Sequence, residues 1–214
     1  MQKLFLFLLA NINKGPLINL IKKMFLESPT DPPMQKGSIE VICGSMFSGK
    51  TEELLRRIKR AKYTKLNIKI FKPKVDTRYD NKKIVSHDDN YIESIIVEDS
   101  NEILSFIENA EIVAIDEAQF FNKNLFTICN KIANNGIRVI VAGLDMDFLG
   151  NPFGPMPKLL SVADHITKVH AICVDCGAIA NYSFRKTKNH ELIRLGKQNE
   201  YKPLCRKCFN INMD

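Results

Sequence analysis

Residues 44–51 read Gly-Ser-Met-Phe-Ser-Gly-Lys-Thr and match the pattern G-x-x-x-x-G-K-[ST], which wraps the phosphates of a nucleoside triphosphate. Before this stretch, residues 39–43 form a short β-branched run that predicts a buried strand. After it, apolar residues recur at helical spacing, at Leu54, Leu55, Ile58 and Ala61. Strand, glycine loop and helix in this order favour a phosphate-binding loop over an ordinary strand-to-helix turn.

Each residue type in this loop has a physical role. Glycines let backbone N–H groups approach an anion closely, and the following helix adds the positive end of its dipole. Lys50 is expected to reach the β- and γ-phosphates, and the Thr51 hydroxyl to hold Mg²⁺. The sequence therefore predicts binding of ATP and Mg²⁺ by Gly44, Ser45, Met46, Phe47, Ser48, Gly49, Lys50 and Thr51.

The composition indicates a folded chain with an anionic partner. The 214 residues suffice for one α/β domain with a small appendage, and the hydrophobic fraction of 45% supplies a core. A charged fraction of 26% excludes a disordered chain. The net charge of +7 suits a nucleotide or a nucleic acid and does not choose between them.

Residues 1–37 differ from the rest. The first ten residues begin like a signal peptide, but the apolar run is short, and polar residues stand where a cleavage site is expected. The run is also too short to span a bilayer. We expect residues 1–37 to be an extension outside the fold, with Met24 or Met34 as a possible true start. A membrane or targeting role is the alternative.

Downstream, apolar strands alternate with helices. Strands are expected at 68–71, 111–116 and 137–141, a further strand or hairpin arm at 92–97, and helices at 103–107 and 122–135. This alternation predicts an α/β fold of the P-loop NTPase type (RecA-like), with a mainly parallel sheet over residues 38–166. Ligands bind such a sheet at the carboxyl ends of its strands. The Gly- and Pro-rich residues 143–157 are expected at that edge.

A second chemical motif, Asp116-Glu-Ala-Gln119, ends one of these strands. An acid there is the second Mg²⁺ partner of a P-loop NTPase, which predicts that role for Asp116. The adjacent Glu117 can accept a proton from an attacking hydroxyl. The alternative is a solvated residue that begins a loop. Helicases carry a similar acidic box, but a complete helicase motor needs two such lobes, and this chain is too short for both.

Four of the six cysteines form two C-x-x-C pairs, at Cys173, Cys176, Cys205 and Cys208. Two such pairs supply the four thiolates of a structural zinc site, with no open position for catalysis. The alternatives are surface dithiols with redox activity, or a zinc ribbon that binds nucleic acid. A zinc-binding domain is expected over residues 167–210. Cys43 and Cys129 lie in apolar surroundings and are expected to be small core residues.

Together these motifs resemble the thymidine kinases of the cellular, zinc-containing class (type II). The resemblance covers about residues 38–209 in one consistent order. It comprises the loop at 44–51, Asp-Thr-Arg-Tyr at 76–79, Ser-His-Asp at 86–88, Asp-Glu-Ala-Gln-Phe-Phe at 116–121, Gly-Leu-Asp-Met-Asp-Phe at 143–148, Asn-Pro-Phe-Gly-Pro-Met at 151–156 and the cysteine pairs.

The resemblance implies transfer of the γ-phosphoryl group of ATP to the 5′-hydroxyl of thymidine, giving thymidine monophosphate for DNA synthesis. Glu117 would be the catalytic base, with Lys50 as the second catalytic residue. Besides the loop, the nucleotide would contact Asp76, Thr77, Arg78, Asp116, Glu117, Ala118 and Gln119. Structural Zn²⁺ and Mg²⁺ with ATP are implied, as are a cytoplasmic homotetramer, feedback inhibition by thymidine triphosphate, and no nucleic-acid or membrane partner.

In this family a zinc-held lasso closes over the base. The resemblance places Phe148 against the base and Ser183 beside its methyl group. The implied substrate-binding residues are Met46, Leu144, Phe148, Ser183, Leu192, Ile193, Arg194, Leu195, Gly196 and Tyr201. Thr is familiar where this chain has Ser183, so deoxyuridine is expected to compete better, since a methyl contact contributes ~1–3 kcal/mol.

The alternative function is a P-loop ATPase that binds nucleic acid through its basic zinc ribbon. Such a protein stacks successive bases on a series of aromatic side chains. In this unit the aromatic residues are scattered, at Tyr182, Phe184, Tyr201 and Phe209. The sequence therefore favours a nucleoside kinase.

Overall fold

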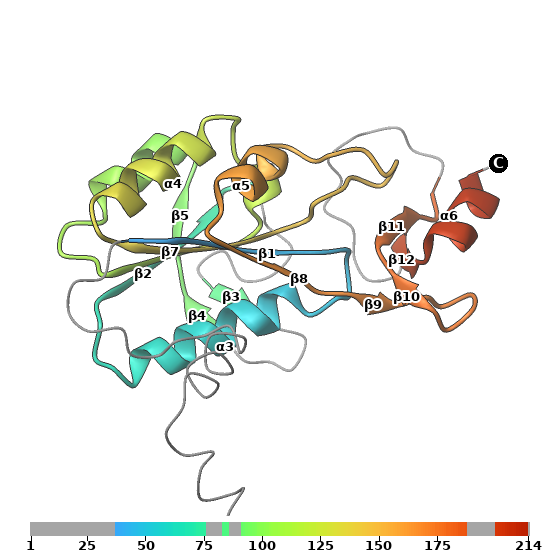
Figure 1. Ribbon diagram of the computed structural model, residues 1–214, viewed down its shortest axis with the longest axis horizontal. Helices are drawn as coiled ribbons and strands as arrows, with labels where there is room; N and C mark the ends of the chain where they lie inside the picture. Colours follow the sequence, from blue (N-terminus) through green and yellow to red (C-terminus); the bar gives the residue numbers. More distant parts are fainter. Residues whose placement is uncertain (1–36, 76–82, 86–90, 188–199, 214) are drawn as a thin grey trace, which may run out of the picture. The chain divides into compact units, whose positions relative to one another are not determined.

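The central element is a parallel six-stranded sheet with strand order β5-β2-β6-β7-β1-β8. The computed structural model describes residues 37–75, 83–85, 91–187 and 200–213 (Figure 1). The strands of the sheet are β1 (Ile39–Cys43), β2 (Ile68–Pro73), β5 (Ile95–Val97), β6 (Ile112–Ile115), β7 (Arg138–Gly143) and β8 (His165–Lys168). The predicted α/β fold with a mainly parallel sheet is confirmed.

Helices cover both faces of the sheet (Figure 1). One face packs against α4 (Leu125–Asn134), α5 (Met156–Val162) and the 3₁₀ helix η2 (Ser100–Ser105). The other face packs against α3 (Lys50–Lys62). Since side chains alternate along a strand, β1 is apolar on both faces: Val41 lies in the first cluster and Ile42 in the second.

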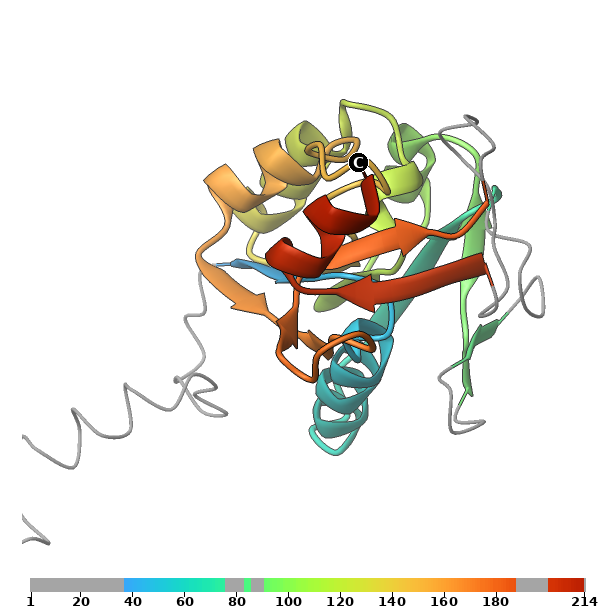
Figure 2. The same ribbon diagram turned by 90° about the vertical axis from the view of Figure 1, so that its right-hand side faces the viewer.

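A smaller unit follows β8. It contains β9 (Ala171–Ile172), β10 (Ile179–Ala180), β11 (Tyr182–Arg185), β12 (Tyr201–Leu204) and α6 (Arg206–Met213). Figure 2 shows β11 and β12 beside α6. Its core includes the stacked rings of Tyr182 and Phe209, with centroids 4.4 Å apart, and Phe47 of the glycine loop packs against this core. The unit thus contacts the loop that follows β1.

Several element predictions are confirmed and two are corrected. The further strand or hairpin arm predicted at 92–97 is in fact two strands: β4 (Tyr91–Glu93) pairs with β3 (Lys83–Val85) in a separate antiparallel hairpin, while β5 joins the main sheet. The chain changes sheet at Ser94, but apolar residues on both sides hide the break in the sequence. The helix predicted at 103–107 is η2, which begins earlier because Asp99 and Glu102 form a capping box.

Helix α5 and strand β8 are among the elements with no counterpart in the prediction. Helix α5 carries Pro157 in its first turn, where proline is tolerated, and follows a Gly- and Pro-rich loop. Strand β8 lies at the edge of the sheet with His165 and Ile166 exposed, so it lacks an apolar pattern and is held by backbone pairing to β1. The expected boundary between residues 166 and 167 falls inside β8. None of the described helices combines the length and apolar character that a bilayer span needs.

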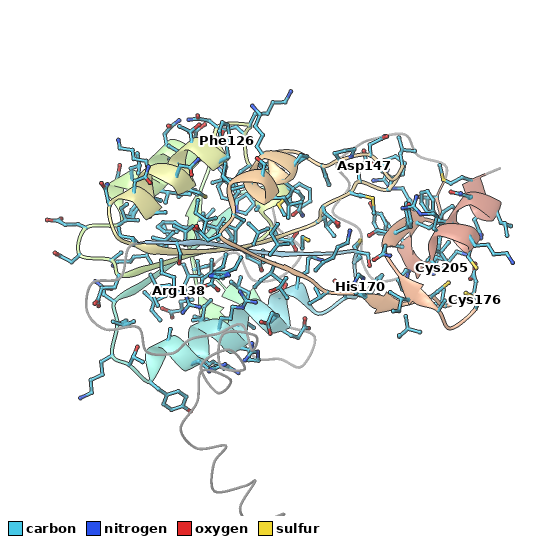
Figure 3. All side chains as sticks on the ribbon, viewed as in Figure 1. Phe126, Arg138, Asp147, His170, Cys176 and Cys205 are labelled. Carbon is cyan, nitrogen blue, oxygen red and sulfur yellow. The ribbon has the colours of Figure 1, made fainter. Side chains whose placement is uncertain are left out.

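A buried ion-pair cluster ties α3 to the sheet. Glu40 on β1 is 7% exposed and accepts hydrogen bonds from Arg57 at 2.7 Å and from Arg138 (labelled in Figure 3) at 2.5 and 3.0 Å. Arg57 also donates to Glu53 and to Thr167 on β8, both at 2.8 Å. Burial opposes ionisation of Glu40, but the two arginines outweigh it and lower its pKa.

Glu40→Gln is expected to lower the free energy of unfolding by about 3 kcal/mol at pH 7, because the buried Arg57 and the partly buried Arg138 lose a negative partner. The folded pKa of Glu40 lies below its unfolded value of 4.5. Its carboxylate therefore stabilises the fold above that value, and this contribution disappears as the pH falls through the folded pKa. Urea unfolding of both proteins across this pH range measures the effect.

Glu98→Gln is the matched control, since it removes an exposed ion pair with Lys74 and is expected to cost less than about 1 kcal/mol. If the difference between wild type and Glu40→Gln stays constant as the pH falls below about 4, the charge of Glu40 is not its source.

Candidate active site

The glycine loop leaves β1 at Gly44 and enters α3 at Lys50. Gly44 has a φ of 146°, and a Cβ on it would lie 2.1 Å from the carbonyl oxygen of Val169, so only glycine fits beside the chain that follows β8. Gly49 has a φ of 85° and directs the chain into the helix. The loop therefore ends at the N-terminus of a 13-residue helix, where backbone N–H groups and the helix dipole favour an anion.

Side chains of the loop gather at one carbonyl group. The Nζ of Lys50 and the Oγ of Ser48 donate to the carbonyl oxygen of Ser45, at 2.8 and 2.7 Å. The Oγ of Ser45 is buried and has no hydrogen-bond partner among the described residues. Phe47 has a φ of 64°, a strained conformation for a residue with a side chain. The loop thus holds an ammonium group and an unsatisfied hydroxyl in a strained turn.

The acidic motif stands at the carboxyl end of β6, two strands from the loop in the sheet. Asp116 is buried, and its Oδ1 accepts a hydrogen bond from the backbone N–H of Glu117 at 2.9 Å. Glu117 has a φ of 52°, again in the left-handed region, before the 3₁₀ helix η3 (Ala118–Phe120). Such strain costs on the order of 1–3 kcal/mol and is concentrated at functional sites. The two carboxylates are therefore held in a fixed turn at the ligand edge of the sheet.

Gln119 connects Glu117 to the loop after β7. Its Nε2 donates to Oε2 of Glu117 at 2.5 Å, and its Oε1 accepts from the backbone N–H of Leu144 at 2.9 Å. Gln119 is 2% exposed; its hydrogen bond with Leu144 is buried, and the one with Glu117 is partly buried. Gly154, with a φ of 52°, lets the chain pass the carbonyl oxygen of Gln119, to which an added Cβ would approach within 2.2 Å. The carboxylate of Glu117 is thereby oriented by a buried amide.

The smaller unit reaches the glycine loop through Ser183. This residue lies on β11 and is buried, and its Oγ accepts a hydrogen bond from the backbone N–H of Met46 at 2.9 Å. Phe148, from the loop after β7, lies under the guanidinium group of Arg185, with 3.7 Å between the Cζ atom and the ring centroid. Arg185 also donates to the hydroxyl of Tyr201. Met46, Ser183, Phe148 and Tyr201 thus belong to one connected region, as the resemblance implies.

Other predicted site residues lie outside the described part of the chain. These are Asp76, Thr77 and Arg78, and the lasso segment Leu192, Ile193, Arg194, Leu195 and Gly196. Their roles stay predictions.

Sequence reasoning missed two charged groups at this edge. Asp145, which is 8% exposed, pairs with Lys168 at the end of β8, with 2.7 Å between Oδ2 and Nζ. Arg185 is the other. Strand periodicity was a usable signal for Arg185, since it lies two residues after Ser183 and so on the same face of β11.

The four paired cysteines form a metal-binding cluster. Their Sγ atoms all lie within 4.8 Å of one another, and those of Cys176 and Cys205 are 3.6 Å apart. Figure 3 shows these two residues close together in the smaller unit. Tetrahedral zinc with Zn–S bonds of 2.3 Å separates its sulfurs by about 3.8 Å, so the spacing fits. The donor set is compatible with zinc.

Thiol ionisation in the cluster is uneven. Burial opposes ionisation of Cys173, but backbone hydrogen bonds from Cys205 and Asp175 outweigh it and lower its pKa to about 6. Hydrogen bonds with the thiols of Cys176 and Cys205 raise the pKa of Cys208 to about 12. Four thiolates this close repel one another, so a cation is needed to hold all four deprotonated.

The other two cysteines, Cys43 and Cys129, are core residues, as predicted. Both are buried. Burial, followed by the charge of Asp145, raises the pKa of Cys43 to about 11, and burial raises that of Cys129 to about 12. Neither thiol is a nucleophile at neutral pH.

Comparison with known proteins agrees with this geometry. The sequence model of the family described as thymidine kinase matches residues 37–209. A thymidine kinase of Bacteroides thetaiotaomicron is 55% identical over 186 residues, covering 87% of this chain and 94% of the relative. Those of Porphyromonas gingivalis (54% identity; 82% and 86% coverage) and a Rhodothermus species (50%; 81% and 81%) are also similar. With the family model matching most of this chain and relatives this similar, the chain belongs to the thymidine kinase family.

Proposed function

We propose that this chain transfers the γ-phosphoryl group of ATP to the 5′-hydroxyl of thymidine. The observation that carries the proposal is the hydrogen-bonded series from Glu117 through Gln119 to Leu144. It links a carboxylate beside a metal-binding acid to the loop after β7, at the sheet edge where the phosphate loop also ends. A phosphate donor and a second substrate can therefore meet at Glu117.

On the donor side, the backbone N–H groups of residues 44–49 and the ammonium group of Lys50 bind the triphosphate. On ATP binding, Lys50 exchanges the Ser45 carbonyl for phosphate oxygens. Thr51 and the buried carboxylate of Asp116 would hold Mg²⁺, which neutralises phosphate charge when bound. The unsatisfied Ser45 hydroxyl suits a ligand oxygen or a water of the metal shell. Asp76, Thr77 and Arg78 complete this side in our proposal.

On the acceptor side, Glu117 takes the proton of the 5′-hydroxyl as its oxygen attacks the γ-phosphorus. The bond between the γ-phosphorus and the β,γ-bridging oxygen breaks, and ADP leaves with that electron pair. Gln119 holds the carboxylate in place, so the reaction needs little reorganisation. Phosphoryl transfer depends mainly on such positioning and on charge neutralisation.

The base is held in our proposal by Met46, Leu144, Phe148, Ser183 and Tyr201, with the backbone of residues 192–196 closing over it. The loop 192–196 belongs to a zinc-binding lasso domain, in which structural zinc fixes the two ends of the chain around Cys173–Cys176 and Cys205–Cys208. We further propose a cytoplasmic homotetramer that is inhibited by thymidine triphosphate and binds no nucleic acid.

An acceptor panel tests the function. Purified protein with ATP and Mg²⁺ is expected to phosphorylate thymidine best, deoxyuridine more weakly and deoxycytidine least. Failure to phosphorylate any nucleoside, together with ATP hydrolysis that DNA or RNA stimulates and salt suppresses, would support the nucleic-acid-binding ATPase instead.

Ser183 offers a matched pair of variants for base selection. Ser183→Thr keeps the acceptor for the Met46 N–H and adds a methyl group, and we expect it to raise the preference for thymidine over deoxyuridine by about 5- to 10-fold, within the range of one methyl contact. Ser183→Ala removes the acceptor and leaves the N–H of Met46 unpaired. It is expected to lower kcat/KM for thymidine and deoxyuridine alike. The ratio of kcat/KM values for the two nucleosides measures the effect. An unchanged ratio in Ser183→Thr would show that Ser183 does not contact the methyl group of the base.

A further inference from the structure

Arg185 is a buried cation that contacts two aromatic residues at once. Arg185 is 6% exposed, although a guanidinium group is costly to remove from water. Nε and Nη2 donate to the hydroxyl of Tyr201 at 3.0 and 2.8 Å. The face of the same group covers the ring of Phe148, with 3.7 Å between the Cζ atom and the centroid. Two kinds of contact therefore fix this side chain.

These contacts join separate parts of the fold. Arg185 and Tyr201 are directly opposed in the β11–β12 pair, whereas Phe148 comes from the loop after β7. On the same face of β11, Ser183 accepts the hydrogen bond from Met46 of the phosphate loop. One face of β11 thus carries Ser183, which contacts the phosphate loop, and Arg185, which contacts Phe148 and Tyr201.

The chemistry of arginine explains why this residue suits the position. Its planar guanidinium group can stack on a ring with its face while its edge donates hydrogen bonds in a fixed fork. A lysine ammonium is a point charge and cannot do both with the same geometry. A methionine fills similar space but neither donates nor carries charge. One rigid guanidinium group therefore links Phe148 to Tyr201.

We propose that Arg185 is a positioning residue for the acceptor nucleoside, holding in place Phe148 and Tyr201, the two aromatic residues that the proposed function assigns to the base. The inference rests on the proposed function and adds a residue that acts through two others. It predicts an effect on nucleoside affinity without an effect on ATP, because the two residues that Arg185 is argued to position, Phe148 and Tyr201, belong to the base side of the proposed site.

Steady-state kinetics of single variants test this role. Arg185→Met is expected to raise KM for thymidine about 10-fold or more, with KM for ATP and kcat within about 2-fold of wild type, the pattern of lost ground-state binding. The KM for thymidine of Arg185→Lys is expected to lie between the values of wild type and Arg185→Met. Lys202→Met is the control, since Lys202 lies over the ring of Phe184 in the same unit, away from Phe148, and is expected to leave both KM values unchanged.

A double-mutant cycle identifies the partner. Tyr201→Phe keeps the ring and removes only the hydroxyl that accepts both hydrogen bonds, so it is expected to fold and to raise KM for thymidine on its own. Because both variants break one contact, the double variant is expected to be about as impaired as Arg185→Met alone, short of the product of the two effects.

Three results would overturn the proposal. They are an unchanged KM for thymidine in Tyr201→Phe, equal losses toward ATP and thymidine in a folded Arg185→Met, and full additivity in the cycle. If wild type phosphorylates thymidine and the variants match it, only the role of Arg185 fails. If wild type neither binds nor phosphorylates any nucleoside, the proposed function fails with it.

Discussion

Glu117→Gln is expected to lower kcat for thymidine phosphorylation by about 10²- to 10⁴-fold, the usual contribution of a positioned general base. The amide keeps the size of the side chain and its contact with Gln119 but cannot accept the proton of the 5′-hydroxyl. Glu117→Ala is expected to be at least as impaired. Binding of ATP should persist in both, because the glycine loop and Lys50 are untouched.

Rapid-quench kinetics with labelled ATP and equilibrium binding of ATP together measure this prediction. Glu111→Gln is the matched control, as Glu111 precedes the same strand and is exposed, and the described hydrogen bond of its carboxylate is with the backbone N–H of Asn67. Near wild-type turnover in Glu117→Gln would exclude Glu117 as the base. Loss of ATP binding would instead assign it to the donor side.

The second large effect is expected from the cysteine cluster. Cys205→Ala should remove bound zinc and abolish thymidine binding, because the apparent binding free energy of structural zinc, ~10–16 kcal/mol in small zinc domains, also stabilises the fold around it. The core of the smaller unit has few buried residues, among them the stacked Tyr182 and Phe209, the latter on α6. Without metal, Ser183 and Arg185 would lose the frame that orients them.

Metal content by mass spectrometry, thermal unfolding and binding of thymidine and ATP measure this outcome. Cys129→Ala is the control, since Cys129 lies on α4 and is buried in the core of the main domain. This variant is expected to keep one zinc per chain. A Cys205→Ala protein that retains stoichiometric zinc, or retains thymidine binding without it, would contradict a structural metal site.

Local patterns were enough to predict the centre of this fold. The β-branched runs that became β1, β6 and β7 are buried on both faces, and such runs are recognisable without tertiary information. The clustering of the four cysteines followed from their spacing and is confirmed. The acidic motif was placed correctly at the end of a strand because strand ends and ligand edges coincide in parallel sheets.

Features set by tertiary contacts were not predictable. The exposed edge strand β8 exists because β1 offers it a pairing edge, and its own residues carry no strand pattern. The link from Glu117 through Gln119 to Leu144 joins residues far apart in sequence. The stacking of Arg185 on Phe148 likewise depends on how β11 meets the loop after β7.

The fate of the transferred phosphoryl group tests the central claim most directly. Protein is mixed with γ-labelled ATP, Mg²⁺, thymidine and single-stranded DNA, and the products are separated. We predict that nearly all label appears at the 5′ position of thymidine monophosphate, with little inorganic phosphate and no effect of the DNA. Label recovered mainly as inorganic phosphate, at a rate that DNA increases, would contradict a two-substrate kinase site.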